Sequence, residues 1–347
     1  MSGERKAILD VLNGRIPERR PIWLMRQAGR YLPEYRQLRA EAGSFLNLCY
    51  DPVKAAEVTL QPLRRFDLDA AILFADILLI PQALGSGLSF RENEGPHLST
   101  IRSDADLLAL EPAKAMDRLA PVFETVARVR AALPKHVGLI GFCGAPWTVA
   151  SYMIEGGGSD ERLLSRRVAY ENPAWFKALM DMLIESSIGY LAAQVRAGAE
   201  AVQIFDSWAG DLSASQWDDV VISPMRRIVE GLRHEVGPVP VIGFARGLGA
   251  GHYRLATETG VNAVGCEQAV PAQWMAKQLV PHCAVQGNLD PLALTIGGDV
   301  LARSVRALTA SIPMHGHIFN LGHGVRQETA PEAISLLVET VRNSDAH

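Results

Sequence analysis

The sequence lacks the features that define membrane, secreted and nucleotide-binding proteins. No apolar run approaches the roughly 20 residues that a membrane-spanning helix needs. Residues 1–10 carry no secretory leader and no CxxC pair occurs, so we expect a cytoplasmic protein with free thiols at Cys49, Cys143, Cys266 and Cys283. No GxGxxG follows the first predicted strand and no P-loop motif occurs, which leaves dinucleotide and nucleotide-phosphate sites unsupported.

The chain also lacks an excess of charge of either sign. Its 34 Lys and Arg residues against 38 Asp and Glu give a net charge of −4, so nothing favours nucleic acid or an anionic membrane as a partner. Any cationic site must therefore be local. The spaced His and Cys sets of zinc sites are absent, and His282, His315 and His317 lie at the starts of apolar runs, so we predict no metal site.

The chain does contain a repeating pattern of short apolar, β-rich runs, each followed by a longer segment with helical periodicity. This alternation is typical of parallel βα units. Eight strands close a (β/α)8 barrel, so we predict an α/β TIM barrel in which residues 1–347 form a single domain. A doubly wound open sheet is the alternative, although it usually carries a glycine-rich phosphate fingerprint. The eight runs span residues 21–25, 70–74, 137–142, 201–205, 240–244, 263–266, 283–286 and 317–321.

Capping residues place several helices. Asp51 and Asn172 are each followed by proline, the combination of an N-cap with proline at the first helical position, and predict helices that end near residues 65 and 196. Pro224 should kink or divide the segment 213–234. A last helix is expected over residues 331–342, packing an apolar stripe on the barrel.

Two insertions interrupt the alternation of strands and helices. Residues 84–101 alternate around a turn at Glu94-Gly95-Pro96, which predicts a β-hairpin after the second strand. The glycine-rich residues 156–160 follow the third strand and predict a mobile loop. Both insertions fall on the side of a barrel where active sites and lids are built.

Polar residues follow the predicted strands and form a candidate site. Several cations with one buried carboxylate indicate a pocket for a polycarboxylate or a phosphate, because arginines at strand ends are costly unless an anion pairs with them. The residues at the strand ends are Arg26, Arg30, Asp76, Tyr152, Asp206, Ser207, Arg246, Glu267, Asn288, Asp290 and His323.

Each candidate also has an ordinary structural explanation. An arginine after a strand can pair with a neighbouring glutamate, Asp76 can be a helix N-cap, and Tyr152 can be part of the core. Ser207 can be a cap or a ligand contact, and the pattern does not separate the two. Two arginines that flank Gly29, where backbone can approach a ligand, favour a functional role for that segment.

Six segments resemble sequence blocks of one family, the uroporphyrinogen decarboxylases, in the same order along nearly the whole chain. PIWLMRQAGRYLPEYR at residues 21–36 and GFCGAPWTVASYMIEGG at residues 141–157 resemble the two signature motifs, and the shorter segments are FADIL, FDSWAG, QGNLDP and FNLGHGV. The resemblance implies a single (β/α)8 barrel, usually a homodimer. It also implies a lyase that, without a cofactor, converts the four acetate side chains of uroporphyrinogen III to methyls, giving coproporphyrinogen III and CO2 in haem biosynthesis.

The resemblance also implies roles for individual residues. Arg26 and Arg30 match the arginines that bind substrate carboxylates, and Asp76 matches the aspartate that accepts hydrogen bonds from the pyrrole N–H groups. We expect Arg26, Arg30, Asp76 and Tyr152 to take part in catalysis. The positions that match substrate-contacting residues are Arg26, Gln27, Ala28, Gly29, Arg30, Asp76, Tyr152, Ser207 and His323.

The chemistry of such a reaction agrees with the charges at the strand ends. Losing CO2 from an acetate arm needs an electron sink, and protonation of the pyrrole α-carbon makes one. The carboxylate of Asp76 can stabilise that cation. We expect an arginine or a substrate carboxyl to deliver the proton, and the sequence does not decide between them.

Three positions depart from the family pattern. Glu267-Gln268 stand where many members have Asp-Trp, Arg246 stands where a lysine is common, and Gln327 replaces a proline. These changes concern the shape of the cleft. The main alternative is a cobalamin-dependent, zinc-activated thiol methyltransferase, whose His-x-Cys and strand-eight cysteine are missing at residues 244–246 and 322–323. A non-catalytic porphyrinogen-binding protein is the other alternative.

Overall fold

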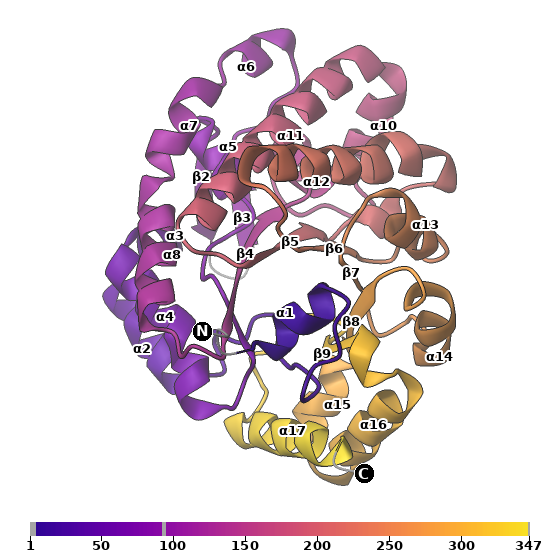
Figure 1. Cartoon of the computed structure of the whole chain (residues 1–347). Helices are drawn as coiled ribbons and strands as arrows, with labels where there is room; N and C mark the ends of the chain where they lie inside the picture. The colour runs from indigo at the N-terminus through magenta and orange to yellow at the C-terminus, as the bar shows by residue number, and fades with distance from the viewer. Residues whose placement is uncertain (1–4, 92–94, 346–347) are drawn as a thin grey trace.

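Parallel strands form the centre of the molecule and curl into a barrel (Figure 1). The computed structural model describes residues 5–91 and 95–345, and within them the main sheet has seven strands in the order β1-β4-β5-β6-β7-β8-β9, all paired in parallel. The predicted fold class, a TIM-barrel-like α/β fold, is confirmed. The strands are β1 (Ala70–Ile72), β4 (Gly138–Gly144), β5 (Ala201–Asp206), β6 (Val241–Ala245), β7 (Ala263–Gly265), β8 (Ala284–Leu289) and β9 (His317–Leu321).

The segment 21–25 closes the barrel between β9 and β1, but the prediction that it forms a regular strand is wrong. Ile22 forms one isolated parallel bridge to Phe319, and its carbonyl accepts a hydrogen bond from the Asp69 amide at 2.8 Å. The Trp23 amide donates to the Phe319 carbonyl at 3.3 Å, but Ile22 N–H donates to the Asp69 carboxylate at 2.7 Å and Met25 N–H donates to Asn320 Oδ1 at 2.9 Å. At these two positions side-chain acceptors replace the ladder of a regular strand.

Helices cover the outside of the barrel (Figure 1). The helices between the barrel strands and after the last are α8 (Ala120–Ala132), α11 (Pro173–Arg196), α12 (Ser223–Val236), α13 (Gly251–Glu258), α14 (Ala272–Trp274), α16 (Gly298–Ser311) and α17 (Pro331–Ser344), and α4 (Pro52–Arg65) precedes β1. Shorter or additional helices are α1 (Ala7–Leu12), α2 (Pro33–Glu41), α3 (Phe45–Tyr50), α5 (Leu79–Ala83), α6 (Asp104–Leu108), α7 (Pro112–Arg118), α9 (Pro146–Glu155), α10 (Leu163–Glu171) and α15 (Pro291–Ile296).

The predicted helix starts are confirmed. The Asp51 carboxylate accepts hydrogen bonds from the amides of Val53 and Lys54, and α4 ends at Arg65. Asn172 caps α11 in the same way. A π-helical turn at Asp218–Ile222 precedes α12, so the segment that contains the Ser-Pro pair is divided as expected. The last helix, α17, extends two residues beyond the predicted end.

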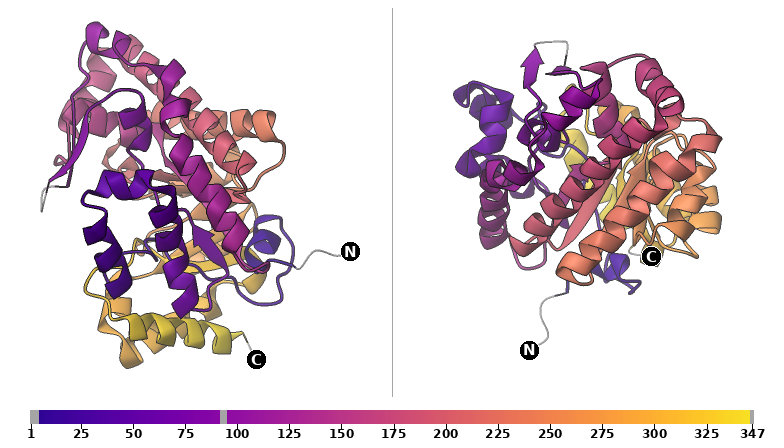
Figure 2. Two further views of the ribbon diagram at one scale, coloured as in Figure 1. Left: turned by 90° about the vertical axis from the view of Figure 1, so that its left-hand side faces the viewer. Right: turned by 90° about the horizontal axis from the view of Figure 1, so that it is seen from above.

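The two ends of the barrel differ. At one end α1 lies across the opening (Figure 1), and its Ile8, Val11 and Leu12 pack with barrel-interior residues such as Ile140 and Phe244. At the other end the antiparallel hairpin of β2 (Leu88–Arg91) and β3 (Gly95–Leu98) projects from the molecule, as the left view of Figure 2 shows. The predicted hairpin insertion is therefore confirmed, although Gly95 and Pro96, predicted to lie in its turn, belong to β3 and pair with β2. Residues 92–94, which include Glu94 of the predicted turn, lie outside the described residues.

The glycine-rich loop after α9 lies against this hairpin. The Leu98 amide donates to the Gly156 carbonyl at 2.8 Å, and Gly156 adopts a left-handed φ of 86° that ends α9. The hairpin and the loop therefore form one wall at the same end of the barrel. The mobility of residues 156–160 stays a prediction.

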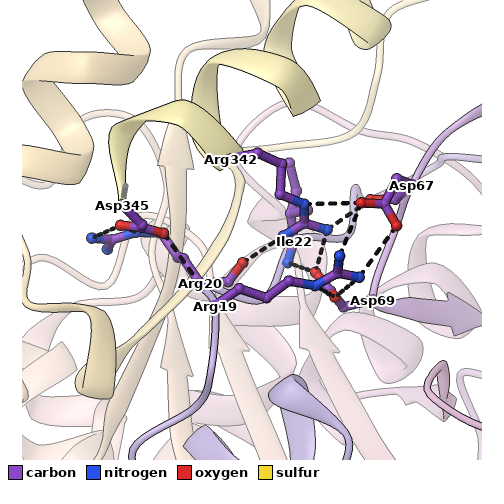
Figure 3. A network of polar contacts seen from close by, with 7 residues as sticks. All are labelled: Arg19, Arg20, Ile22, Asp67, Asp69, Arg342 and Asp345. Atoms are coloured by element: carbon purple, nitrogen blue, oxygen red, sulfur yellow. Dashed lines mark hydrogen bonds and ion pairs between the residues drawn. The ribbon is translucent and has the colours of Figure 1, made fainter. Parts of the chain in front are cut away.

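A network of arginines and aspartates joins the two chain ends beside the closing seam (Figure 3). The buried Asp69 carboxylate accepts hydrogen bonds from Arg19 Nε and Arg342 Nη2, each at 2.8 Å, in addition to the Ile22 amide. Arg20 is also buried, and its guanidinium donates to the Ile312 and Thr309 carbonyls of the C-terminal half. The network lies at the amino end of β1, which is the end of a barrel associated with stability.

Candidate active site

The predicted site residues lie at the carboxyl ends of the strands, opposite α1. Arg26 follows the segment 21–25, Asp76 follows β1, His323 follows β9, and Tyr152 lies on α9 directly after β4. The positive charge of Arg26 lies close enough to influence the pKa values of Asp76, Tyr152 and His323. The structure therefore brings these four residues together.

Arg26 has an unusual backbone conformation. Its φ is 60°, in the left-handed region that residues other than glycine rarely adopt and that costs on the order of 1–3 kcal/mol. Hydrogen bonds on either side hold it, because the Val325 amide donates to the Met25 carbonyl and the Gln27 amide donates to the Leu24 carbonyl. A strained conformation that the neighbouring backbone maintains is typical of functional positions.

The side chain of Arg26 lies across Gly324. A Cβ atom on Gly324 would lie 2.4 Å from Cδ of Arg26, so any larger residue at 324 would displace the arginine. The guanidinium is exposed and forms no ion pair within the described part of the chain. Arg26 is therefore positioned by the neighbouring glycine and is available to an anion.

Asp76 lies at the mouth of the barrel and keeps part of its surface accessible. One carboxylate oxygen accepts a hydrogen bond from the Leu78 amide at 2.8 Å. Burial raises the pKa of Asp76 above its ordinary value, while the Leu78 amide and the charge of Arg26 oppose this rise. Asp76 therefore caps a turn, which is its ordinary structural role. The charge of Arg26 also influences the pKa of Asp76, and the charge of Asp76 influences the pKa of Tyr152.

His323 is neutral at pH 7. Burial, together with the charges of Arg26 and Arg246, lowers the pKa of His323 to about 4. Its Nδ1 accepts a hydrogen bond from the Gly324 amide at 2.7 Å. The proton of the neutral ring must therefore be on Nε2, which makes His323 a hydrogen-bond donor beside two arginines.

The other candidate residues are less closely joined to this group. Arg30 is exposed without an ion pair in the described residues, and its charge influences Tyr35 instead. Ala28 and Gly29 are half-buried, and Ser207 is half-buried at the end of β5.

Gln27 is committed to the protein itself. Its Nε2 donates to the Ala70 carbonyl at 3.1 Å, its Oε1 accepts from the Leu24 amide, and its carbonyl accepts from the Tyr31 hydroxyl at 2.6 Å. With an exposed fraction of 1%, Gln27 braces the turn that carries Arg26 rather than presenting polar groups to the cleft.

A buried carboxyl group, that of Asp206, connects two elements that carry candidate site residues. Asp206, the last residue of β5, accepts a hydrogen bond from Thr148 Oγ1 at 2.6 Å, which ties β5 to α9. Burial raises the pKa of Asp206 to about 7, against the effect of that hydrogen bond. Asp206 and Ser207 are adjacent at a predicted strand end, and the difference in burial between them appears only in the fold.

The sequence is similar to known proteins over nearly its whole length. A family model described as uroporphyrinogen decarboxylase (URO-D) matches residues 4–344. The chain is 50% identical over 341 residues to a Rhodospirillum rubrum protein named uroporphyrinogen decarboxylase, covering 98% of each chain. A protein of the same name from Granulibacter bethesdensis is 51% identical over 342 residues, which cover 97% of this chain and 99% of the relative.

The chain belongs to the uroporphyrinogen decarboxylase family.

A solved structure described as a methyltransferase from Methanosarcina mazei has the same fold as this family member. The TM-score is 0.82 over 98% of this chain and 99% of the other, at 19% sequence identity.

In residues 5–91 and 95–345 no group of three or more His, Cys, Asp or Glu side chains is arranged to hold a metal ion. The helices in those residues include none with the length and apolar character to cross a membrane.

Arg246, a departure from the family pattern, lies near the candidate site residue His323. It follows β6, is half-buried, and has no ion pair within the described residues. Its amide donates to the Asp206 carbonyl at 2.9 Å and its carbonyl accepts from the Gly210 amide at 2.9 Å, so the backbone on both sides of the guanidinium is fixed. Together with Arg26, it provides a second cation beside His323.

The departure at Glu267 has a partner that the sequence did not suggest. Glu267 Oε2 lies 3.4 Å from His252 Nε2, and both side chains are buried. Burial raises the pKa of Glu267, but His252 and the backbone amides of Glu267 and Gly247 outweigh this effect, and the pKa lies below its ordinary value. His252 is on α13, and nothing in its local sequence distinguishes it from a surface histidine. Gln327, the third departure, is exposed.

Proposed function

We propose that this chain is a uroporphyrinogen decarboxylase, an enzyme of porphyrin biosynthesis. It converts the four acetate side chains of uroporphyrinogen III to methyls, releasing CO2 and giving coproporphyrinogen III. Family membership over residues 4–344 and relatives of that name near 50% identity support this function. The observation that carries it is the position of Asp76, a partly accessible carboxylate at the barrel mouth under the charge of Arg26.

Positively charged side chains bind the carboxylates of such a substrate. Uroporphyrinogen carries eight carboxylates, and Arg26, Arg30 and Arg246 offer guanidinium groups that no carboxylate of the described chain neutralises. Guanidinium groups bind carboxylates in a bidentate geometry. The neutral His323 adds an Nε2–H donor between two of these cations.

The chemistry needs an anion. Protonation of a pyrrole α-carbon makes the ring cationic, and the electrons of the bond to CO2 then flow into the ring as CO2 leaves. The remaining exocyclic methylene gains a proton to become a methyl, and loss of the proton first added at the α-carbon restores the aromatic pyrrole, so one proton is consumed for each CO2 released. Asp76 accepts hydrogen bonds from the pyrrole N–H groups and stabilises the positive charge that develops. Arg26 or a substrate carboxyl delivers the first proton, and Tyr152 contacts the substrate from α9.

We also propose that the enzyme needs no cofactor, because the substrate ring itself holds the electrons. The chain acts as a homodimer of single-domain barrels, in keeping with the family resemblance. Light scattering tests the dimer directly, and a monomer at working concentrations would contradict it.

The methyltransferase alternative rests on fold alone. The likeness to the Methanosarcina mazei structure has 19% sequence identity, which carries no information on activity. At the position where the thiol methyltransferases carry zinc ligands, this chain has Phe244, Ala245 and Arg246.

Anaerobic incubation of the purified protein with uroporphyrinogen III tests the function. The products are oxidised and separated by the number of carboxyl groups, and we expect a shift from eight to four. A parallel sample with a strong chelator should react at the same rate. Absence of carboxyl loss would refute the decarboxylase function, while loss of activity with chelator would favour a metal-dependent enzyme.

A further inference from the structure

Arg162 is a buried arginine that no family motif selects. It directly precedes α10, and its side chain turns inward with only 5% of the residue exposed. Both Glu161 and Arg162 adopt left-handed φ values, 54° and 53°, which non-glycine residues rarely do. Burying a guanidinium is unfavourable unless another group compensates for the lost hydration, so arginines are almost never fully buried without a partner.

The partner of Arg162 is an aromatic ring. Its guanidinium carbon lies 3.7 Å from the centroid of Trp208, which is a close cation–π contact. Its polar contacts are long for their kinds, since Nη1 donates to Ser159 Oγ at 3.3 Å and Nε lies 3.9 Å from Asp211 Oδ2. The guanidinium therefore stacks on the indole and has unused donor capacity.

Trp208 connects this arginine to the site. It follows β5, and its ring lies 6.2 Å from the ring of Tyr152 at an angle of 57°. Two hydrogen bonds hold the backbone of Trp208: its carbonyl accepts from Trp147 Nε1 at 2.9 Å, and its amide donates to Thr148 Oγ1 at 3.3 Å. The indole N–H is buried and lowers the pKa of Tyr152 as a hydrogen-bonding neighbour, and the guanidinium of Arg162 stacks on the ring.

The charge of Arg162 also reaches Tyr152. Burial raises the pKa of the Tyr152 hydroxyl, and Arg162 is the strongest of the groups that oppose this rise. Asp76 acts in the other direction. Arg162 thus influences Tyr152 both through the indole ring and through its charge.

We propose that Arg162 is a positioning residue for Tyr152, acting through Trp208, in the decarboxylation proposed above, on which this inference rests. The residues before α10 come from the glycine-rich loop that packs on the hairpin, where the Leu98 amide donates to the Gly156 carbonyl. The contact therefore ties the outer wall of the cleft to a residue of the site. A positioning residue of this kind affects turnover more than the binding of substrate carboxylates.

The test compares Arg162→Gln, Arg162→Lys and Trp208→Leu with the double variant Arg162→Gln/Trp208→Leu. Arg167→Gln is the matched control, because Arg167 is an exposed arginine of α10 that pairs with Glu171. We expect Arg162→Gln to lower kcat roughly tenfold, as loss of a desolvated cation–π contact would. KM for uroporphyrinogen III should stay within about twofold. Lysine keeps a cation over the ring, so Arg162→Lys should recover part of the rate.

The double variant separates an indirect role from a direct one. If Arg162 acts through Trp208, Arg162→Gln should change kcat little in the Trp208→Leu background, because contacting residues are not additive. Near-UV circular dichroism should change in Arg162→Gln and not in Arg167→Gln. If Arg162→Gln does not fold, the comparison of Arg162→Lys with the wild type in both backgrounds decides in its place.

Three results would overturn the proposal while the wild type remains active: unchanged kcat in Arg162→Gln, an effect confined to KM, or additive effects in the double variant. An inactive wild-type enzyme would instead refute the decarboxylase function, so the two failures are distinguishable.

Discussion

Removing the Asp69 carboxylate should destabilise the protein more than any surface charge change. Asp69 is 2% exposed and accepts from the Ile22 amide at 2.7 Å, a bond that joins the segment 21–25 to β1 (Figure 3). A hydrogen bond to a buried charge contributes about 1.5–3 kcal/mol. The pairs with Arg19 and Arg342, whose side chains are 38% and 18% exposed, add at most about 1 kcal/mol each. Asp69→Ala should therefore lower the free energy of unfolding by about 4 kcal/mol, as loss of one partner of a buried pair does.

Asp67→Ala is the matched control for this experiment. Asp67 binds the same two arginines, with Arg19 Nη1 at 3.0 Å and Arg342 Nε at 3.1 Å, but its side chain is 53% exposed. Its loss should cost less than about 1 kcal/mol. Asp69→Asn should lie between the two, because the amide oxygen still accepts from the Ile22 N–H. Urea unfolding followed by far-UV circular dichroism measures all three, and equal costs for Asp69→Ala and Asp67→Ala would refute the role given to the buried carboxylate.

Two further predictions concern the site. The folded-state pKa of Asp206 is about 7 against an ordinary value of 3.8, so the native state binds the proton more tightly, and its contribution to stability is present below pH 3.8 and is lost as pH rises through 7. Asp206→Asn should therefore gain about 2.5 kcal/mol over the wild type between pH 5 and pH 8 in urea unfolding, and a pH-independent difference would contradict this. Arg246→Ala should raise KM for uroporphyrinogen III roughly tenfold with a small change in kcat, as loss of a charged hydrogen bond does, and Arg246→Lys should be intermediate. An unchanged KM in steady-state assays would remove Arg246 from the binding site.

Features set by neighbouring residues were predictable from the sequence. Caps such as Asp51 and Asn172 bind amides two or three residues away, and apolar runs flanked by turns gave seven of the strands to within three residues at each end. The positions of Arg26, Asp76, Tyr152 and His323 near one another followed from parallel strands ending at the same side of the barrel.

Features set by distant residues were not predictable. The segment 21–25 has the composition of a strand, but its amides bond to the side chains of Asp69 and Asn320, which are 47 and 295 residues away. Gln27 lies in a segment predicted to bind ligand, yet its side-chain amide donates to the Ala70 carbonyl of β1, 43 residues away. Arg162, directly before α10, reaches Trp208 only because the fold brings two segments 46 residues apart in the sequence together. None of these contacts leaves a periodic or local signal in the sequence.

The central claim is that cations bind the substrate while the anion of Asp76 promotes the chemistry. Asp76→Asn tests it most directly, because the amide keeps the size and the hydrogen bond from the Leu78 amide but removes the charge. Single-turnover decarboxylation of uroporphyrinogen III should slow by roughly 10²–10³-fold, the loss that follows removal of one preorganised stabilising group. Affinity for coproporphyrinogen III under anaerobic conditions should remain within about twofold, since Arg26 and its neighbours are untouched. A near-normal rate, or an equal loss of binding and turnover, would contradict the claim.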